Sequence, residues 1–384
     1  MGLFLPLEKE TIRTLESFSA LTDKVFPIPE RFHRDLPKDV AELSRLLTNS
    51  RGERHESYLN KPAMLSAYLR YFLPWNLYRL CSLLPGLSLG FNAGDAITDL
   101  GSGPLTLLLA LWISRPDLRN TPLEVRCVDR SASVLDAGKK LFSALAGEDS
   151  VWRIKTIRAD IGSEIRGEKS VLVSALNVFN ERFLDIPHNN SGALSVFAEK
   201  SARLLDGLIS ESGTVLVVEP GIPRCGEFIS FLRSAFINRG FVPRFPCSHT
   251  DSCPFSGGKN KWCHFTLETF SAPKSLLKLS ADAKLPKERA GISFLSVTRQ
   301  VQQVIERQPD ERLAVRVISD AFPINVTQKR NVFGRYGCSA RGMILVTGEK
   351  LSVEREKSGA LLMLDASSTE KRDAKTGALI LEIT

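Results

Sequence analysis

Residues 99–104 have the sequence Asp-Leu-Gly-Ser-Gly-Pro and lie where a short apolar run at 96–100 gives way to an apolar helical pattern at 105–114. Glycines at such a turn let the backbone pass close to a ligand, and the preceding Asp99 can accept a hydrogen bond from a charged amino group. A dinucleotide-binding fold would need a third glycine at position 106, which is Thr106, and a phosphate-binding loop would need Gly-Lys-Ser/Thr. We therefore expect a ligand site of another kind where a first strand ends.

Short apolar runs alternate with helical patterns around this loop. Strand candidates are 96–100, 125–128, 154–157, 171–175, 214–218 and 291–298, and helix candidates are 105–114, 133–145, 195–205 and 226–239. Strands that alternate with helices imply a mainly parallel sheet covered on both faces. The tail adds strand candidates at 313–318, 343–346 and 361–364. We predict an α/β fold with a helical extension over 1–90, a Rossmann-like sheet domain over 91–310 with a cysteine-rich insertion at 244–264, and a small β region over 311–384.

Two more acids follow strand candidates as Asp99 does. Asp129 ends the second candidate, where a carboxylate can accept hydrogen bonds from both ribose hydroxyls, and Asp160 follows the third. An acid before two spaced glycines resembles motif I of class I methyltransferases, which implies a class I methyltransferase-like sheet and S-adenosyl-L-methionine as cofactor. The resemblance further implies methionine contacts near the glycine loop and an adenine contact at Asp160. The implied cofactor-binding residues are Asp99, Gly101, Gly103, Asp129 and Asp160.

The composition is that of a soluble globular protein, with 384 residues of which 43% are hydrophobic and 24% charged. The most apolar stretch, 63–87, is interrupted by arginines and prolines, so we expect no membrane span. Glu8 and Glu10 follow the apolar start and argue against a signal peptide or a mitochondrial presequence. We expect a cytoplasmic monomer of bacterial type. The net charge of +8 favours a polyanionic partner if the charge is clustered.

Three of the seven cysteines lie close together at 244–264, a segment without regular periodicity. Cys247, Cys253 and Cys263 have the spacing C-x5-C-x9-C, and thiolates are preferred ligands of zinc and of iron–sulfur clusters. Because the segment has no Cys-x-x-Cys pair, a metal site and a set of unrelated buried thiols explain the spacing equally well. The candidates for a fourth ligand are His249, His264, Cys225 and Cys338.

The other cysteines have simpler interpretations. Cys81 and Cys127 lie in apolar patterns typical of small buried hydrophobic residues. Cys225 is expected to begin a helix, and Cys338 to lie in a turn-like, basic stretch at 335–339.

The cysteine-rich segment resembles the signature of the Rsm-twenty-two family in three pieces, 247–249, 253–255 and 262–265. Members are methyltransferase-like proteins associated with the small ribosomal subunit in mitochondria and bacteria. The resemblance extends over roughly residues 58–348 and implies a 4Fe-4S cluster bound by four cysteines. Carried over to this chain, the ligands are Cys247, Cys253, Cys263 and Cys338. The family often has Pro-Gly-Thr after its second glycine where this chain has 104–106 as Pro-Leu-Thr, so we expect weak cofactor binding.

The stretch 321–341 contains four basic residues and no acid. Phe333 and Tyr336 are interleaved with these charges and offer stacking surfaces. An ordinary solvated hairpin would explain the same composition, but the family resemblance favours ribosomal RNA as the partner. The expected RNA contacts are Lys259, Lys261, Lys329, Arg330 and Arg335.

The resemblance implies a function in small-subunit assembly or translation through rRNA binding, with S-adenosyl-L-methionine as cofactor. The sequence leaves methyl transfer open, because residues 174–181 contain neither an Asp/Asn-Pro-Pro-aromatic motif nor a cysteine nucleophile. Asn177, Asn180 and Glu181 could position a substrate there or serve as ordinary caps. The alternatives are a non-catalytic assembly factor that keeps the fold, and an RNA methyltransferase stabilised by zinc at a Cys3His site.

Overall fold

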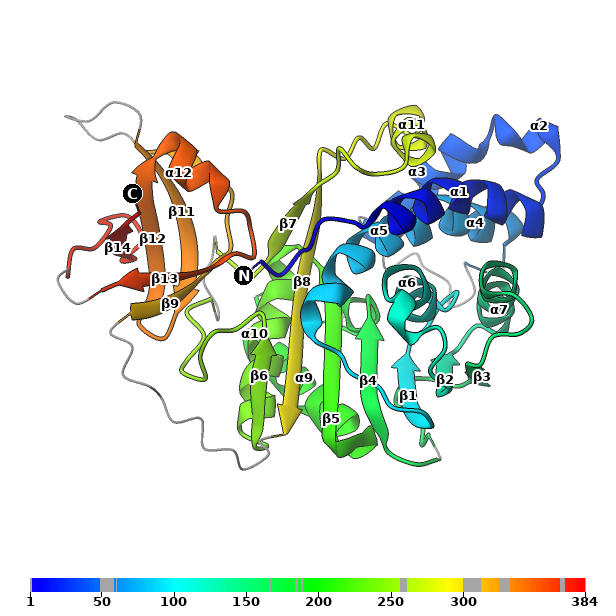
Figure 1. Ribbon diagram of the computed structural model, residues 1–384, viewed down its shortest axis with the longest axis horizontal. Helices are drawn as coiled ribbons and strands as arrows, with labels where there is room; N and C mark the ends of the chain where they lie inside the picture. Colours follow the sequence, from blue (N-terminus) through cyan, green and yellow to red (C-terminus); the bar gives the residue numbers. More distant parts are fainter. Residues whose placement is uncertain are drawn as a thin grey trace.

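The computed structural model describes residues 2–48, 59, 61–165, 167–183, 186–187, 189–255, 261–299, 312–324, 332–366 and 370–383. It contains a larger β-sheet with helices on both faces and a smaller sheet formed by the C-terminal residues (Figure 1). Within these residues, no helix has the length and apolar character needed to cross a membrane.

The larger sheet has the strand order β3-β2-β1-β4-β5-β8-β6, with β7 paired to β8. Its strands are β1 Asp95–Leu100, β2 Leu123–Asp129, β3 Arg153–Arg158, β4 Ser170–Leu176, β5 Ile209–Pro220, β6 Phe241–Phe245, β7 Phe265–Glu268 and β8 Arg289–Arg299. The strands from β1 to β5 pair in parallel, whereas β8 runs antiparallel to both β5 and β6. One antiparallel strand between the last two parallel ones is the class I methyltransferase arrangement, so the predicted fold class is confirmed.

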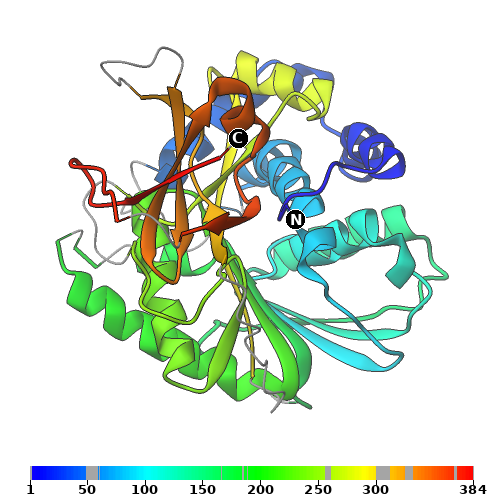
Figure 2. The ribbon, with the colours of Figure 1, turned by 60° about the vertical axis from the view of Figure 1, so that its left-hand side comes forward.

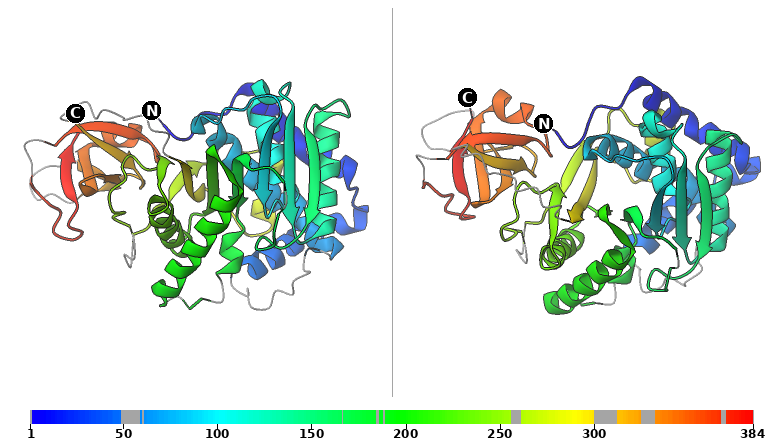
Figure 3. Two further views of the ribbon diagram at one scale, coloured as in Figure 1. Left: turned by 90° about the horizontal axis from the view of Figure 1, so that it is seen from below. Right: turned by 60° about the horizontal axis from the view of Figure 1, so that its bottom comes forward.

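Helices cover both faces of this sheet, as Figure 3 shows. They are α6 Thr106–Ser114, α7 Ala132–Ala146, α9 Ser191–Leu208 and α10 Pro223–Ile237, with the short η5 Pro116–Leu118 and α8 Phe179–Arg182 in the connections. In β5, Leu216 and Val218 belong to the core that includes α6 and α7, while Val215 and Val217 belong to the core that includes α9 and α10. Burial on both faces explains why the apolar runs in the sequence are continuous rather than alternating.

The N-terminal helices are anchored at the edge of the sheet where the parallel strands end. They are α1 Lys9–Val25, α2 Glu30–His33, α3 Leu36–Thr48, α4 Pro62–Ala67, η3 Tyr68–Phe72, α5 Leu73–Leu83 and η4 Leu84–Leu87. Trp75 of α5 donates to the hydroxyl of Ser280 (3.3 Å) in α11 Lys274–Asp282. Arg79 donates to the carbonyl of Gly291 (3.0 Å) near the start of β8, which pairs with the end of β5. These contacts hold α5 against α11 and the start of β8, at the carboxyl edge of the sheet.

The smaller sheet has the order β13-β9-β11-β12-β14, with β10 paired to β11. Its elements are β9 Arg312–Val317, β10 Phe322–Pro323, β11 Val332–Ser339, β12 Gly342–Glu349, α12 Lys350–Arg355, β13 Leu361–Asp365 and β14 Leu379–Glu382. It has its own core, which includes Val315, Ile344 and Leu379. Figures 1 and 2 show it beside the β6 and β7 side of the larger sheet. The three predicted tail strands correspond to β9, β12 and β13.

One local prediction is wrong: Cys338 lies within strand β11, not in a turn. It pairs with Arg316 of β9 on one side and with Met343 of β12 on the other. The glycine that suggested a turn, Gly337, serves packing, because a Cβ atom there would lie 2.5 Å from a methyl group of Val315. The glycine therefore permits two strands to approach closely.

Candidate functional site

The glycine loop leaves β1 in a conformation that favours glycine. Gly101 and Gly103 have φ values of 64° and 52°, in the left-handed region. At Gly101 space is also limiting, because a Cβ atom would lie 2.3 Å from a methyl carbon of Val178 in the segment after β4. The loop is thus fixed against the neighbouring strand connection, and its backbone lies at the carboxyl edge of the sheet.

Asp99 lies beneath this loop with a relative exposure of 1%. Its Oδ1 accepts a hydrogen bond from the hydroxyl of Ser174 (2.6 Å), whereas its Oδ2 is buried without a partner among the described residues. Burial raises the pKa of Asp99 to about 7. A buried carboxylate oxygen with no donor is costly, so a positive charge brought near the loop by a ligand would favour the ionised form of Asp99.

Asp129 ties β2 to the glycine loop. Its Oδ2 accepts the backbone N–H of Gly103 (3.0 Å), and its Oδ1 accepts that of Ser131 (2.9 Å). The sequence suggested only a ribose acceptor here, and the structure adds an anchoring role for the same carboxylate. Each oxygen retains a second lone pair, so both roles are compatible.

Replacing Asp129 by alanine should weaken S-adenosyl-L-methionine binding by ~1–3 kcal/mol, because the variant has no charged acceptor for the ribose and the loop. Isothermal titration calorimetry measures this weakening directly. Asp136→Ala is the matched control, since Asp136 is an exposed acid on α7. Equal affinity of Asp129→Ala and wild type would remove Asp129 from the site.

The third predicted acid, Asp160, follows β3, and both of its carboxylate oxygens have partners within the protein. Its Oδ2 pairs with Arg182 of α8 (2.6 Å), and its Oδ1 accepts the backbone N–H of Gly162 (3.0 Å). The ion pair joins the segments that follow β3 and β4. Asp160 therefore lies at the expected edge, and its adenine contact stays a prediction.

The segment after β4 is held by Glu219, a residue that sequence reasoning missed. Glu219 is fully buried near the end of β5, and its carboxylate accepts the backbone N–H groups of Phe179 (2.9 Å) and Asn180 (3.2 Å). Burial raises its pKa to about 8. The sequence does contain one sign of this role, which is an acidic residue within the otherwise apolar run that forms the end of β5. The side-chain oxygen of Asn180 is buried without a partner in the described part of the chain, and Glu181 pairs with Arg130 at 3.5 Å.

Tyr68, in helix η3, lies near the carboxyl edge of the larger sheet. Burial raises the pKa of its phenol well above the usual range, and the charges of Glu181 and Asp129 raise it further. The electrostatic influence of both acids places the Tyr68 side chain near the segments after β2 and β4. The nearness of helix η3 to this edge was not predicted from the sequence.

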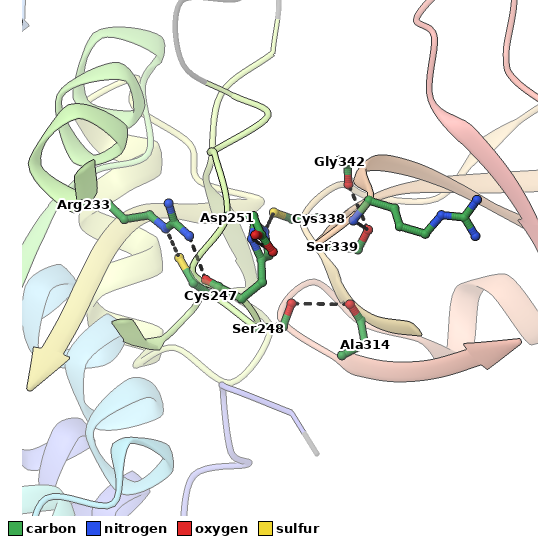
Figure 4. Close-up of polar contacts among 10 residues, drawn as sticks. Arg233, Cys247, Ser248, Asp251, Ala314, Cys338, Ser339 and Gly342 are labelled. Atoms are coloured by element: carbon green, nitrogen blue, oxygen red, sulfur yellow. Dashed lines mark hydrogen bonds and ion pairs between the residues drawn. The ribbon is translucent and has the colours of Figure 1, made fainter. Parts of the chain in front are cut away.

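The four predicted cluster ligands lie near enough to influence one another electrostatically, where the irregular segment after β6 adjoins the smaller sheet. Cys247 and Cys253 lie in the irregular segment after β6, Cys263 lies just before β7, and Cys338 comes from β11. Burial raises the pKa values of Cys247, Cys263 and Cys338, and the neighbouring thiols raise them further. Figure 4 shows Cys338 extending from the smaller sheet toward the segment that carries Cys247.

Polar contacts connect this segment to helix α10 and to the smaller sheet. Arg233 of α10 donates from Nε to Sγ of Cys247 (3.2 Å) and from Nη2 to the carbonyl of His249 (2.7 Å). His249 Nε2 lies 3.3 Å from Sγ of Cys338. Arg316 of β9 donates to the carbonyl of Pro246 (2.9 Å), so the strand that pairs with Cys338 also holds the start of the segment.

Two other candidates for a fourth ligand, Cys225 and His264, are placed less favourably, whereas His249 lies beside Cys338. Cys225 is fully buried near the start of α10 in the core beneath α9, which confirms its expected helical position. The ring of His264 is stacked on Trp262, with 4.5 Å between centroids, and its Nδ1 contacts the Trp262 carbonyl. Cys81 and Cys127 are buried, as expected. Among the described residues, no three His, Cys, Asp or Glu side chains are arranged around one point as a metal site requires.

The structure corrects two of the expected RNA contacts. Arg335 has a relative exposure of 5%, and its guanidinium donates to the carbonyls of Val353 and Ser319, so it stabilises the smaller sheet internally. The ammonium of Lys261 is buried 4.0 Å above the ring of Tyr336, which places both groups within the junction. Neither cation is presented to a phosphate. Lys259, Lys329 and Arg330 lie outside the described residues.

The chain matches the family described as "Mitochondrial small ribosomal subunit Rsm22" over residues 94–332. No curated protein matches it. It is similar to a SAM-dependent methyltransferase from Geobacter sulfurreducens in complex with S-adenosyl-L-homocysteine, at 12% identity over 59% of this chain and 91% of that one, with a TM-score of 0.34. It is also similar to magnesium protoporphyrin IX methyltransferase from Synechocystis PCC 6803 with bound SAM, at 11% identity over 68% and 97%, with a TM-score of 0.35. Since the family match includes the glycine loop, the larger sheet and three of the four cysteines, this chain belongs to the small ribosomal subunit Rsm22 family.

Proposed function

We propose that this chain binds S-adenosyl-L-methionine at the carboxyl edge of the larger sheet and acts on the small ribosomal subunit through its RNA. In this proposal a 4Fe-4S cluster joins the two sheets, with Cys247, Cys253, Cys263 and Cys338 as ligands. The observation that carries the proposal is that the irregular segment contacts Cys338 of β11 through His249 and that its thiols influence the Cys338 thiol, in a member of a small-subunit family.

Four thiols are the usual donor set of a 4Fe-4S cluster, and the four proposed cysteines match it in residue type. A zinc ion would accept the same thiols or three of them with one histidine. In the zinc alternative, His249 would be the nitrogen ligand beside the cysteines. When bound, the cluster would supply a fixed junction and one-electron redox chemistry.

The segment after β4 supports methyl transfer as the leading activity. Glu219 holds this segment from below, and the buried oxygen of Asn180 can accept a hydrogen bond from an N–H group of a substrate. The second candidate is a non-catalytic assembly factor that keeps the fold. It is favoured by the ion pair between Glu181 and Arg130, which engages an acid that a substrate would otherwise contact.

The affinity for S-adenosyl-L-methionine should rise about fivefold between pH 6 and pH 7, a range in which the α-amino group of the cofactor stays mostly protonated. Asp99 has a pKa of about 7 when no ligand is bound, and the charged amino group of the cofactor favours its ionised form. An acid is roughly one-tenth ionised one pH unit below its pKa, so binding at pH 6 costs a deprotonation. Calorimetry across this range tests the idea, and Asp99→Asn should bind weakly and without the pH dependence. An equally steep rise in Asp99→Asn would assign the titration to another group.

RNA binding should depend strongly on salt, because binding to phosphates releases counterions. Replacing Lys329 and Arg330 together by alanine should reduce the slope of log K against log salt by roughly 0.7–0.9 for each phosphate that is no longer neutralised. Fluorescence anisotropy with a small-subunit rRNA fragment measures the slope, and Lys139→Ala with Lys140→Ala, two exposed lysines of α7, is the control. An unchanged slope would mean that the basic stretch is only solvated.

A further inference from the structure

Arg233 is a buried arginine whose side chain contacts Cys247, one of the proposed cluster ligands. It lies on α10 between Leu232 and Ser234, with a relative exposure of 3%. Its guanidinium donates to the sulfur of Cys247 at 3.2 Å and to the carbonyl of His249 at 2.7 Å. Figure 4 shows the contact between Arg233 and Cys247. The side chain therefore fixes Cys247 and the backbone two residues later against α10.

Arg316 approaches the same site from the smaller sheet. It has a relative exposure of 6% and donates to the carbonyls of Pro246 (2.9 Å) and Gly359 (2.8 Å). Its charge influences the thiols of Cys247, Cys263 and Cys338. Both buried guanidinium groups therefore donate to neutral carbonyls and a thiol, and within the described residues neither forms an ion pair with a carboxylate.

Two buried cations without carboxylate partners need a negative charge nearby, because an unpaired buried charge is strongly destabilising. A 4Fe-4S core held by four thiolates carries a net negative charge, which increases by one unit on one-electron reduction. Donors to ligand sulfur and nearby cations stabilise the more negative state and so raise the reduction potential. Arginine suits this position because its guanidinium stays protonated.

We infer that Arg233, through its hydrogen bond to the sulfur of Cys247 and together with the charge of Arg316, raises the reduction potential of the cluster. This inference rests on the proposed cluster. The electron comes from a small-molecule reductant and enters the cluster, and no bond between cluster and protein forms or breaks. Arg233 is thus a positioning residue that acts through a ligand.

The test is a potentiometric titration of the anaerobically purified full chain, followed by electron paramagnetic resonance with dithionite as reductant. In Arg233→Gln, the ratio of reduced to oxidised cluster at the wild-type midpoint should fall about tenfold, which is about 59 mV for a one-electron couple. The midpoint potential of Arg233→Lys should lie between those of the wild type and Arg233→Gln. Arg224→Gln is the control, because Arg224 is a buried arginine on the same helix that pairs with Glu227 and Pro187. A wild-type midpoint in cluster-loaded Arg233→Gln overturns the inference.

A second measurement uses the wild-type chain, so it does not depend on a variant that folds. Reduced protein labelled with ¹⁵N-arginine should show a ¹⁵N coupling to the cluster in pulsed electron paramagnetic resonance, and labelled Arg233→Lys should lose it. If iron and sulfide analysis finds the cluster but the coupling is absent, the inference fails while the proposed cluster stands. If the protein contains no cluster, the proposed function itself loses its cofactor, and the inference fails with it.

Discussion

Replacing Cys338 by serine should empty the cluster site and release the smaller sheet from the irregular segment, while the larger sheet stays folded. Cys338 is the one proposed ligand from β11, so its removal breaks the connection that the cluster makes between the sheets. Because an unfolded chain has no preformed site, binding of the metal group contributes directly to folding of this junction. Iron and sulfide content should fall by most of the wild-type value, and hydrogen exchange should rise in β11 and in 247–255 but not in β1 or β4.

Cys225→Ser is the matched control for this experiment. Cys225 is fully buried on α10, and the structure places it in the core rather than at the junction. The control should keep its cluster and its exchange pattern. A brown, oxygen-sensitive cluster in Cys338→Ser together with its absence from Cys225→Ser would show that the ligand set is wrong.

Replacing Gly138 by alanine should reduce the affinity for S-adenosyl-L-methionine about a hundredfold or more. Gly138 lies on α7, where a Cβ atom would be 2.4 Å from the carbonyl carbon of Pro104 in the glycine loop. The obstructing atom belongs to the backbone, so the loop must move as a whole. Overpacking costs up to about 3 kcal/mol, and the loop would have to pay that cost again to return to its cofactor-binding position, so the cost appears as lost affinity. Calorimetry measures the affinity, and thermal unfolding shows whether the sheet remains folded.

Gly207→Ala controls for the effect of alanine on a helix. Gly207 is exposed near the end of α9, and a Cβ atom there meets nothing within 4 Å. This variant should keep wild-type affinity and gain about 0.4–1 kcal/mol of stability, because alanine lowers the entropy of the unfolded chain. Equal affinities of the two variants would show that the contact between α7 and the loop does not shape the cofactor site.

The sequence predicts the larger sheet well because its signals are local. The run at 96–100 and the glycines after it suffice to place β1 and its turn, and continuous apolar runs identify strands buried on both faces. Strand β11 was missed because Gly334 and Gly337 interrupt the apolar pattern. Those glycines exist for close packing against Ile324, Leu345 and Val315, contacts that only the folded chain reveals.

A site residue could be predicted when its residue type and its place in a sequence motif already indicate its function. The spacing of Cys247, Cys253 and Cys263 is visible in the sequence, whereas Arg233 resembles any arginine on an amphipathic helix until its contact with sulfur is seen. The error at Arg335 has the opposite origin. A basic stretch was interpreted as surface, but the arginine is enclosed by α12 and donates to backbone carbonyls. Net charge in a segment gives no information about which cations are buried.

Iron and acid-labile sulfide analysis of the anaerobically purified wild-type chain, with zinc measured in the same sample, tests the central claim most directly. The account predicts the full iron and sulfide content of one 4Fe-4S cluster per chain, with little zinc. Stoichiometric zinc without sulfide would contradict it, and His249 would then become the expected partner of the cysteines.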